Sequence, residues 1–423
     1  MLPFFRSKAY DYAELLAVWQ RVVLRQGVAV EVEGRWVLLG DHTYVVKDGG
    51  RMPGVVSLRE TSETQRKPSY FRGQCWGALG LVIGSLRGCF CLPLELRLHQ
   101  GFKHLGQEEP AAAGARPNLA ERVVAMALNW AVHHDGPVWL VLDAYFAVAG
   151  VFRLARSVYS IAWKQPYVAV LTRAKKNYVG YFAAPPKPPH RPGPQPRYGQ
   201  KVHLRECFDH PHLFQTLQCH VYGRLEPVQV LSLPLLWKPL GDWVLFIWAI
   251  TSRGPIVLMC SQLDLSPVAA LELYCVRSRI ELMFDVLKNL LGAFRFRFWT
   301  QKLPRHARRP QPNRHLQAPA PEHQATVGAC WQAYETFVLC ATIAQGLLQL
   351  IALRFGAMVW QHQTLYLRTQ SRLLPSEKTV RQVLASLLLK PLVKVPQNSL
   401  IAKIRRSGVG AEEDDHEDYC QAA

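Results

Sequence analysis

The apolar residues of this chain recur with two different periods, and together they predict alternating strands and helices. Apolar runs typical of buried strands occupy 35–46, 75–85, 89–99, 137–146 and 167–176. Residues 119–134 and 147–158 instead have helical periodicity, and they fall before and after the fourth of these strands. The order is therefore three consecutive strands, helix, strand, helix, strand, which indicates an α/β fold.

This order predicts a ribonuclease-H-like, mixed five-stranded sheet with flanking helices. In such a sheet the first and fourth strands are neighbours, so Asp41 in the first and Asp143 in the fourth would lie side by side. Residues 177–258 break the pattern with a Pro-rich basic linker (185–201) and further strand-like runs. We interpret them as a β-rich insertion that precedes the last helix of the fold.

The resulting domain organisation has five regions. We expect a short N-terminal helical segment (1–30), the first part of the core (31–176), the insertion (177–258), the last part of the core with C-terminal helices (259–400) and a disordered acidic tail (401–423).

The helix after the insertion has clear start and stop signals. Ser266 is a favourable N-cap, Pro267 fits the first helical position, and Gly292 is a typical stop. The spacing predicts one helix between these signals.

Four polar residues share one face of that helix. Tyr274, Arg277, Glu281 and Lys288 are spaced three, four and seven residues apart, which places them within an arc of roughly 60°. A ladder of salt bridges within the helix is the simple alternative for such a set. A carboxylate flanked by cations also suits metal and phosphate chemistry.

The predicted fold brings Glu281 to Asp41 and Asp143. Three carboxylates from separate elements form a hard oxygen-ligand site, which suits Mg²⁺ or Mn²⁺. Two such ions would support an in-line phosphoryl displacement. Arg277 and Lys288 would then bind substrate phosphates, and the Tyr274 hydroxyl would contact phosphate or simply pack.

The charge balance favours a nucleic-acid partner. The net charge is +19, from 50 Lys and Arg against 31 Asp and Glu, although Glu412–Asp418 alone holds six acids. Because no apolar run reaches the ~20 residues that span a bilayer, and the start has no signal-peptide layout, we expect a cytoplasmic protein without a membrane partner.

These motifs resemble those of a large group of bacterial insertion-sequence DDE transposases. Tyr274-x2-Arg277-x3-Glu281-x6-Lys288 is similar to the Y-R-E-K signature of that group. The resemblance extends over about residues 2–390, through six further segments: GDHTYVVK (40–47), KPSYFRGQCWG (67–77), VLDAYFA (141–147), VLTRAKKN (170–177), LDLSP (263–267) and IAQGLLQ (343–349).

The resemblance implies Asp41, Asp143 and Glu281 as catalytic metal ligands for two Mg²⁺ or Mn²⁺ ions. It implies cleavage of double-stranded DNA at transposon ends, strand transfer to target DNA, and a homodimer on DNA in a bacterial, nucleoid-associated setting. Two departures stand out: only 40 residues precede Asp41, and 301–324 has drifted from the family pattern. Asp264 lies near a position where relatives carry an acid.

Other interpretations stay open at the sequence level. The chain would also suit a transposase remnant that only binds DNA, or a stand-alone ribonuclease-H-like nuclease. Trp237 and Trp243 would stack a flipped base or form the core of the insertion. The basic segments 185–201 and 301–309 would contact the DNA backbone.

Overall fold

The computed structural model describes residue 5 and residues 11–59, 70–107, 119–187, 193–307, 309–310, 312–363 and 373–389. The chain forms two compact units, Met1–Thr342 and Ile343–Ala423, which we describe one at a time. The predicted acidic tail (401–423) and most of the first ten residues lie outside the described residues.

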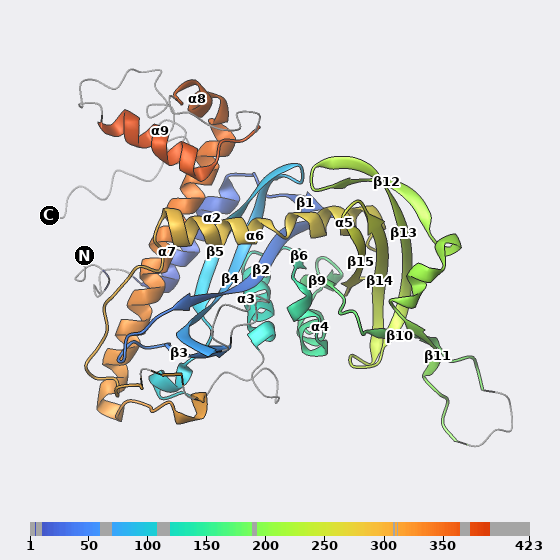
Figure 1. Ribbon diagram of the computed structural model, residues 1–423, viewed down its shortest axis with the longest axis horizontal. Helices are drawn as coiled ribbons and strands as arrows, with labels where there is room; N and C mark the ends of the chain where they lie inside the picture. Colours follow the sequence, from blue (N-terminus) through green and yellow to red (C-terminus); the bar gives the residue numbers. More distant parts are fainter. Residues whose placement is uncertain are drawn as a thin grey trace. The chain divides into compact units, whose positions relative to one another are not determined.

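The first unit is built on one large mixed sheet, so the chain is a mixed α/β protein (Figure 1). The centre of the sheet has the strand order β5-β4-β2-β6-β9. β4 is antiparallel to β2 and β5, whereas β6 is parallel to β2 and β9. These five strands are β2 (Arg35–Val46), β4 (Tyr70–Ser85), β5 (Gly88–Leu98), β6 (Val138–Val141) and β9 (Val168–Arg173).

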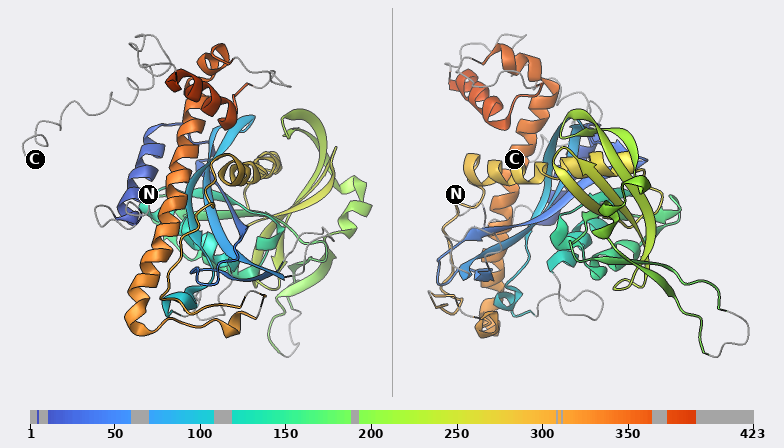
Figure 2. Two further views of the ribbon diagram at one scale, coloured as in Figure 1. Left: turned by 60° about the vertical axis from the view of Figure 1, so that its left-hand side comes forward. Right: turned by 45° about the vertical axis from the view of Figure 1, so that its right-hand side comes forward.

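The sheet does not stop at these five strands, which corrects the prediction of a five-stranded sheet. β15 pairs antiparallel with β9 through Leu258 and Arg173, and joins the insertion to the centre. Within the described residues the combined sheet has 13 strands, and its insertion end curves into an arch (Figure 2). The insertion strands are β10 (Val179–Ala183), β11 (Tyr198–His203), β12 (Gln215–Val221), β13 (Arg224–Trp237), β14 (Asp242–Thr251) and β15 (Gly254–Cys260).

Shorter strands complete the unit. β1 (Glu31–Val32) pairs with β2, and β3 (Val56–Arg59) pairs with the first residues of β4. β7 (Tyr159–Ser160) and β8 (Gln165–Pro166) form a separate two-stranded ribbon.

Helices pack on both faces of the central strands. α3 (Leu119–His133) approaches β2 so closely at Gly40 that an added Cβ would lie 2.5 Å from Val123 Cγ1. Because side chains alternate along a strand, Asp41 points to the opposite face. α4 (Ala149–Arg156) packs beside β9, and Trp19 of α2 (Tyr12–Arg25) donates a hydrogen bond to the Pro93 carbonyl of β5.

The helix after the insertion covers the face to which Asp41 points. Ile280, Met283 and Phe284 are buried in the core against the central strands. The Cys91 thiol of β5 lies 3.6 Å from the Met283 sulfur. This packing fixes the helix above β2, β4 and β5.

That helix is interrupted, although the sequence predicts a single one. α5 (Pro267–Val276) starts at the predicted N-cap, where Ser266 Oγ accepts a hydrogen bond from the Ala269 amide at 3.2 Å. α6 (Arg279–Asp285) continues in the same line after two turn residues (Figure 1). A π-helical turn (Val286–Leu290) follows, and Gly292 ends the element with φ +69°.

Residues Pro321–Arg354, which contain α7 (Gln324–Arg354), are long and apolar enough to cross a membrane by length and composition alone. This corrects the sequence-based statement that no segment reaches that length. Half of the most apolar stretch is buried within the structure. The core helix of a soluble protein meets the same criterion, so this segment is compatible with a soluble protein.

The second unit contains the end of α7 with α8 (Gly356–Gln361) and α9 (Glu377–Leu389). A buried hydrogen bond joins α7 to α9 in this unit, because the Glu377 carboxylate accepts a hydrogen bond from the Gln349 side-chain amide at 2.8 Å. At the start of α9, Ser376 Oγ accepts a hydrogen bond from the Thr379 amide.

Candidate active site

Asp41 lies in the interior of β2, on the face covered by α5 and α6. Its side chain is 17% exposed. Oδ1 accepts a hydrogen bond from the His42 amide at 2.7 Å, and Oδ2 accepts one from the Arg277 guanidinium at 2.7 Å. Both carboxylate oxygens are therefore held in place by donors.

Asp143 follows β6 after one residue and caps the 3₁₀ turn Ala144–Phe146. Its Oδ1 accepts a hydrogen bond from the Tyr145 amide at 2.9 Å, and its carbonyl accepts one from Thr172 of β9. The sequence predicts a strand as far as residue 146, but the capping turn ends it at Val141. This early end places Asp143 at the carboxyl edge of the sheet, beside β2.

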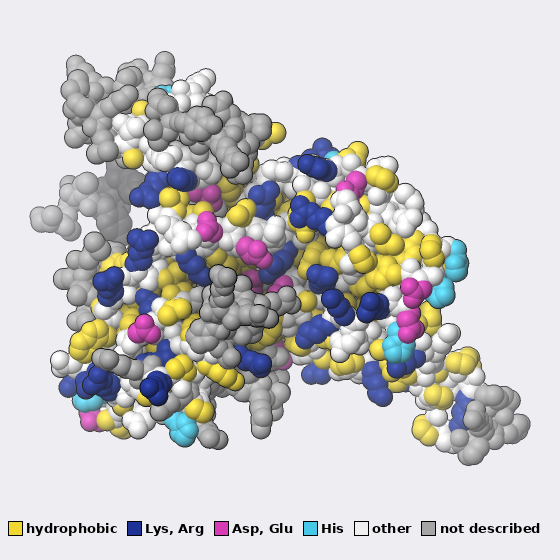
Figure 3. Space-filling model, viewed as in Figure 1, with side chains coloured by type: hydrophobic (Ala, Val, Ile, Leu, Met, Phe, Trp, Pro, Cys, Tyr) yellow, Lys and Arg dark blue, Asp and Glu magenta, His cyan; other side chains and the backbone are white. Residues whose placement is uncertain are grey.

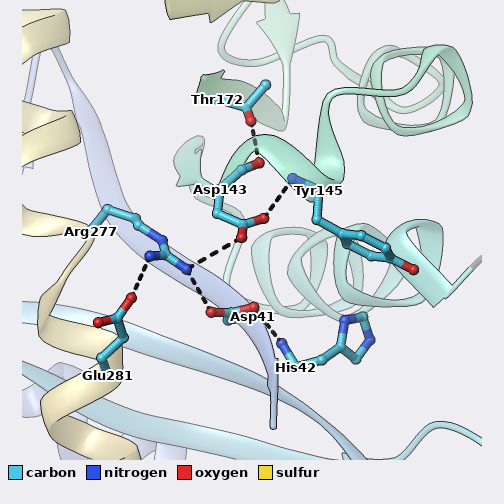
Figure 4. A network of polar contacts seen from close by, with 7 residues as sticks. All are labelled: Asp41, His42, Asp143, Tyr145, Thr172, Arg277 and Glu281. Atoms are coloured by element: carbon cyan, nitrogen blue, oxygen red, sulfur yellow. Dashed lines mark hydrogen bonds and ion pairs between the residues drawn. The ribbon is translucent and has the colours of Figure 1, made fainter. Parts of the chain in front are cut away.

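Glu281 of α6 is linked to Asp41 and Asp143 by Arg277, which contacts all three carboxylates. Arg277 NH1 donates to Glu281 Oε1 at 2.6 Å, and NH2 lies 2.7 Å from Asp41 Oδ2 and 3.7 Å from Asp143 Oδ2. Figure 4 shows the guanidinium between the three carboxylates. The three predicted acids are thus brought together, with one cation as their common partner.

The electrostatics of this cluster follow from burial and like charge. Burial raises the pKa of Asp41 to about 7, against the lowering effect of Arg277 and with a further rise from Asp143 and Glu281. Burial lowers the pKa of Arg277, but the three carboxylates outweigh it and raise that pKa overall. Arg277 is therefore a permanent cation among acids that repel one another.

The other two residues of the predicted helix face take different positions. Burial raises the pKa of the Tyr274 phenol to about 12, and Arg277 and Asp143 both act on it, so Tyr274 belongs to the edge of the cluster. Lys288 lies in the π-helical turn, where its Nζ is 3.4 Å from the Tyr44 carbonyl of β2. Lys288 therefore points to β2, the strand that also carries Asp41.

Two histidines beside Asp41 were not predicted from the sequence. His42 Nε2 lies 3.0 Å from His99 Nδ1, and the His42 ring stacks on Phe146 at an interplanar angle of 3°. Burial lowers the pKa of His42 to about 4, so its ring is neutral at pH 7. The only available signal was that His42 is adjacent to Asp41, because His99 is 57 residues further along the chain.

The three carboxylates are suitable ligands for a divalent cation, but their arrangement around Arg277 differs from that of a metal-binding site. Three carboxylates are the ligands that Mg²⁺ and Mn²⁺ prefer. Within the part of the chain that the structure describes, no three Asp, Glu, His or Cys side chains are placed to hold one ion. Arg277 fills the point between the acids, so metal binding would require it to move.

The remaining candidates lie apart from this cluster. Trp237 is 2% exposed and packs against Phe152 and Tyr178, which favours the core role over base stacking. Trp243 is half-buried in β14. Asp264 is exposed and acts electrostatically on Arg35 and Cys260 instead of on the acidic cluster.

The molecular face above α5 and α6 carries many cations. Figure 3 shows Lys and Arg side chains spread over this face, with a few acidic side chains among them near its middle. Comparison with known proteins adds no further assignment, because neither a family model nor a curated protein sequence matches the chain.

Proposed function

We propose that this chain is a DDE transposase with a ribonuclease-H-like core, which cleaves double-stranded DNA at transposon ends and transfers the strand to target DNA. The observation that carries the proposal is the common contact of Arg277 with Asp41, Asp143 and Glu281. Three acids from β2, the end of β6 and α6 meet at one cation although 240 residues separate the first from the last.

The sheet topology supports the same class. The order β5-β4-β2-β6-β9, with one antiparallel and one parallel half, is the order expected for a ribonuclease-H-like core. The insertion enters after β9 and returns before α5, so Glu281 is delivered by the helix that follows it. A stand-alone nuclease would not require this insertion.

Asp41, Asp143 and Glu281 would hold two Mg²⁺ or Mn²⁺ ions in the working enzyme. Bound ions at such a site activate a water or a 3′-hydroxyl and stabilise the leaving oxygen. The Glu281 side chain is 61% exposed and has room to change its orientation. Arg277, released from the acids, would bind a substrate phosphate through its planar donor fork, and Tyr274 and Lys288 stay candidates for further phosphate contacts.

One observation favours the second candidate, a remnant that binds DNA without cutting it. Arg277 already pairs with the acids, and a permanent ion pair there would block the metal site. The two candidates share the DNA partner and differ only in metal-dependent cleavage, so one experiment separates them.

The test compares Glu281→Gln with Asp285→Asn on the same helix. Asp285 is exposed and pairs with Asn289, so it is a matched control. We expect Glu281→Gln to abolish Mg²⁺- or Mn²⁺-dependent nicking of a plasmid that carries the DNA flanking the gene. Duplex binding should remain, and Asp285→Asn should nick normally.

Equal nicking by both variants would exclude Glu281 from catalysis. DNA binding without nicking by the wild-type protein, at any concentration of either metal, would favour the remnant. Analytical ultracentrifugation with and without end DNA would test the expected homodimer in the same preparation.

A further inference from the structure

A second cationic site lies away from the carboxylates, between the β3–β4 edge of the sheet and the segment after α6. It is an open cavity of about 550 Å³. Five basic or titratable residues line it, and no Asp or Glu is among its described lining residues. The five basic or titratable residues are Arg72, Arg305, His306, Arg309 and His315.

Arg72 is the buried member of this set. The residue is 6% exposed and lies on β4, where it is paired with Ser57 of β3. Its NH2 donates a long hydrogen bond of 3.4 Å to the Gly49 carbonyl, and Asp48 acts on it electrostatically. Its NH1 is buried without a partner among the described residues. An arginine that is left partly unsatisfied is unfavourable without a ligand.

Two histidines lie beside Arg72, which acts electrostatically on both. The rings of His104 and His306 lie 4.5 Å apart, and the Nε2 atom of each is buried without a partner in the described part of the chain. The Gly54 amide donates to His104 Nδ1 at 3.0 Å, so a neutral His104 carries its proton on Nε2. Burial lowers the pKa of His104 to about 3 and of His306 to about 4, so both rings are neutral at pH 7.

The wall that carries the exposed arginines is anchored to the sheet. Asn313 accepts a hydrogen bond from the Ser57 amide at 2.9 Å and donates one to the Ser57 carbonyl at 3.1 Å. The His306 amide donates to the Gly50 carbonyl at 2.7 Å. Arg305 and Arg309, both exposed, are therefore held at the mouth of the cavity by fixed neighbours.

We propose that this cavity binds a phosphate group, with Arg72 and His306 at its base and Arg305 and Arg309 at its mouth. Arginine forks match phosphate oxygens in geometry and charge, and a turn of the Arg72 side chain toward the cavity would give its buried NH1 the acceptor that it lacks. A carboxylate ligand offers fewer oxygens to so many donors.

The phosphate would come from the backbone of bound DNA, a source that rests on the proposed function. Lys47 directly follows β2, and its amide donates a hydrogen bond to the Arg72 carbonyl of β4, so the two residues lie opposite each other. Lys47 is six residues from Asp41, and an even spacing along a strand places Arg72 and Asp41 on the same face of the sheet. Six strand residues span about 20 Å. That span corresponds to about six base pairs along a duplex axis, so the cavity would hold the backbone well outside the cleavage point.

The test uses the full chain with Arg72→Gln, Arg305→Gln and the control Arg21→Gln. Arg305 is exposed and serves if the buried Arg72 variant fails to fold, and Arg21 is an exposed residue of α2 on another element. Calorimetric titration with inorganic phosphate should show binding that falls about tenfold or more in both cavity variants. Duplex affinity measured against NaCl concentration should lose about one unit of its log–log slope.

The outcomes separate the cavity from the proposed function. Equal phosphate binding by the wild-type protein and both cavity variants, or none by any of them, overturns the proposal. Loss of phosphate binding with unchanged duplex affinity and slope overturns DNA as the source, and assigns the cavity to a free phosphate or monoester. If the wild-type protein does not nick DNA but the cavity variants still lose phosphate binding, the proposed function fails and the phosphate site stands.

Discussion

At the residue scale, Arg277 determines the state of the whole acidic cluster. The carboxylates of Asp41, Asp143 and Glu281 lie close together and repel one another. Without a cation among them, their charged forms would be unfavourable. A guanidinium with two contacts of 2.6 and 2.7 Å supplies that cation from within the chain. A metal ion would serve the same purpose, so Arg277 and metal compete for one set of oxygens.

This competition predicts the behaviour of Arg277→Gln. Without metal, the variant leaves Asp41 and Asp143 unpaired, and we expect a loss on the order of 3 kcal/mol in the free energy of unfolding at pH 8. Mg²⁺ should then raise its melting temperature more than it raises that of the wild-type protein, because the acids no longer have an internal partner. Thermal unfolding with EDTA and with Mg²⁺ measures both effects.

The control is Arg279→Gln, two residues along the chain, whose side chain acts on Cys89 instead of on the acids. It should leave the Mg²⁺-dependent shift as in the wild-type protein. An Arg277 variant with the same Mg²⁺ response as the wild-type protein would contradict the competition.

The raised pKa of Asp41 predicts a pH dependence of stability in EDTA. With a pKa of about 7 in the folded protein and an ordinary value of 3.8, the folded state keeps a proton between about pH 4 and 7 that the unfolded state has released. The Asp41 contribution to the free energy of unfolding therefore decreases as the pH rises through this window, by at most about 1.4 kcal/mol per pH unit.

Asp41→Asn removes this contribution. Urea unfolding from pH 4.5 to 8 should show that the variant gains stability relative to the wild-type protein as the pH rises. Asp285→Asn, which changes an exposed carboxylate of α6, should follow the wild-type profile. Parallel profiles for Asp41→Asn and the wild-type protein would mean that Asp41 stays charged throughout.

At the element scale, local signals predicted where the α5–α6 helix begins and ends, but not its interior. The N-cap Ser266 and the stop at Gly292 both depend on neighbouring residues alone, and both are confirmed. The regular period does not predict the π-helical turn Val286–Leu290, which contains Lys288 and changes the number of residues per turn. Local spacing carries no signal for that turn.

The capping of α5 gives the element-scale prediction. Ser266→Ala removes the hydrogen bond from the Ala269 amide and should lower the free energy of unfolding by about 1 kcal/mol. Ser266→Asp should retain most of the stability, because aspartate also caps a helix N-terminus. Chemical denaturation measures both, and an alanine variant as stable as the wild-type protein would show that the cap contributes little.

At the scale of the whole molecule, the sequence predicted the positions of the central strands but not their continuity with the insertion. The predicted strand 35–46 coincides with β2, and the predicted helix 119–134 with α3, because each has a strong local period. The pairing of β15 with β9 depends on contacts such as Met259 with Thr172, which no local pattern encodes. The contact between Arg277 and Asp41 was missed for the same reason.

Net charge belongs to the same scale, and it predicts an effect of the acidic C-terminus on DNA binding. A chain truncated after Gly410 loses six acids and no Lys or Arg, which raises its formal net charge from +19 to +25. The truncated protein should bind duplex DNA several-fold more tightly at 50 mM NaCl, because fewer acids repel the phosphates. Screening should remove the difference above about 0.5 M NaCl.

A full-length variant with the six acids of 412–418 changed to Asn or Gln separates charge from length. If charge is the cause, this variant and the truncated chain should gain the same affinity, measured by fluorescence anisotropy over a range of NaCl concentrations. Tighter binding by the truncated chain alone would assign the effect to the length of the tail. No gain by either protein would show that the six acids do not weaken DNA binding, and the net charge would then overestimate the repulsion that they exert on the phosphates.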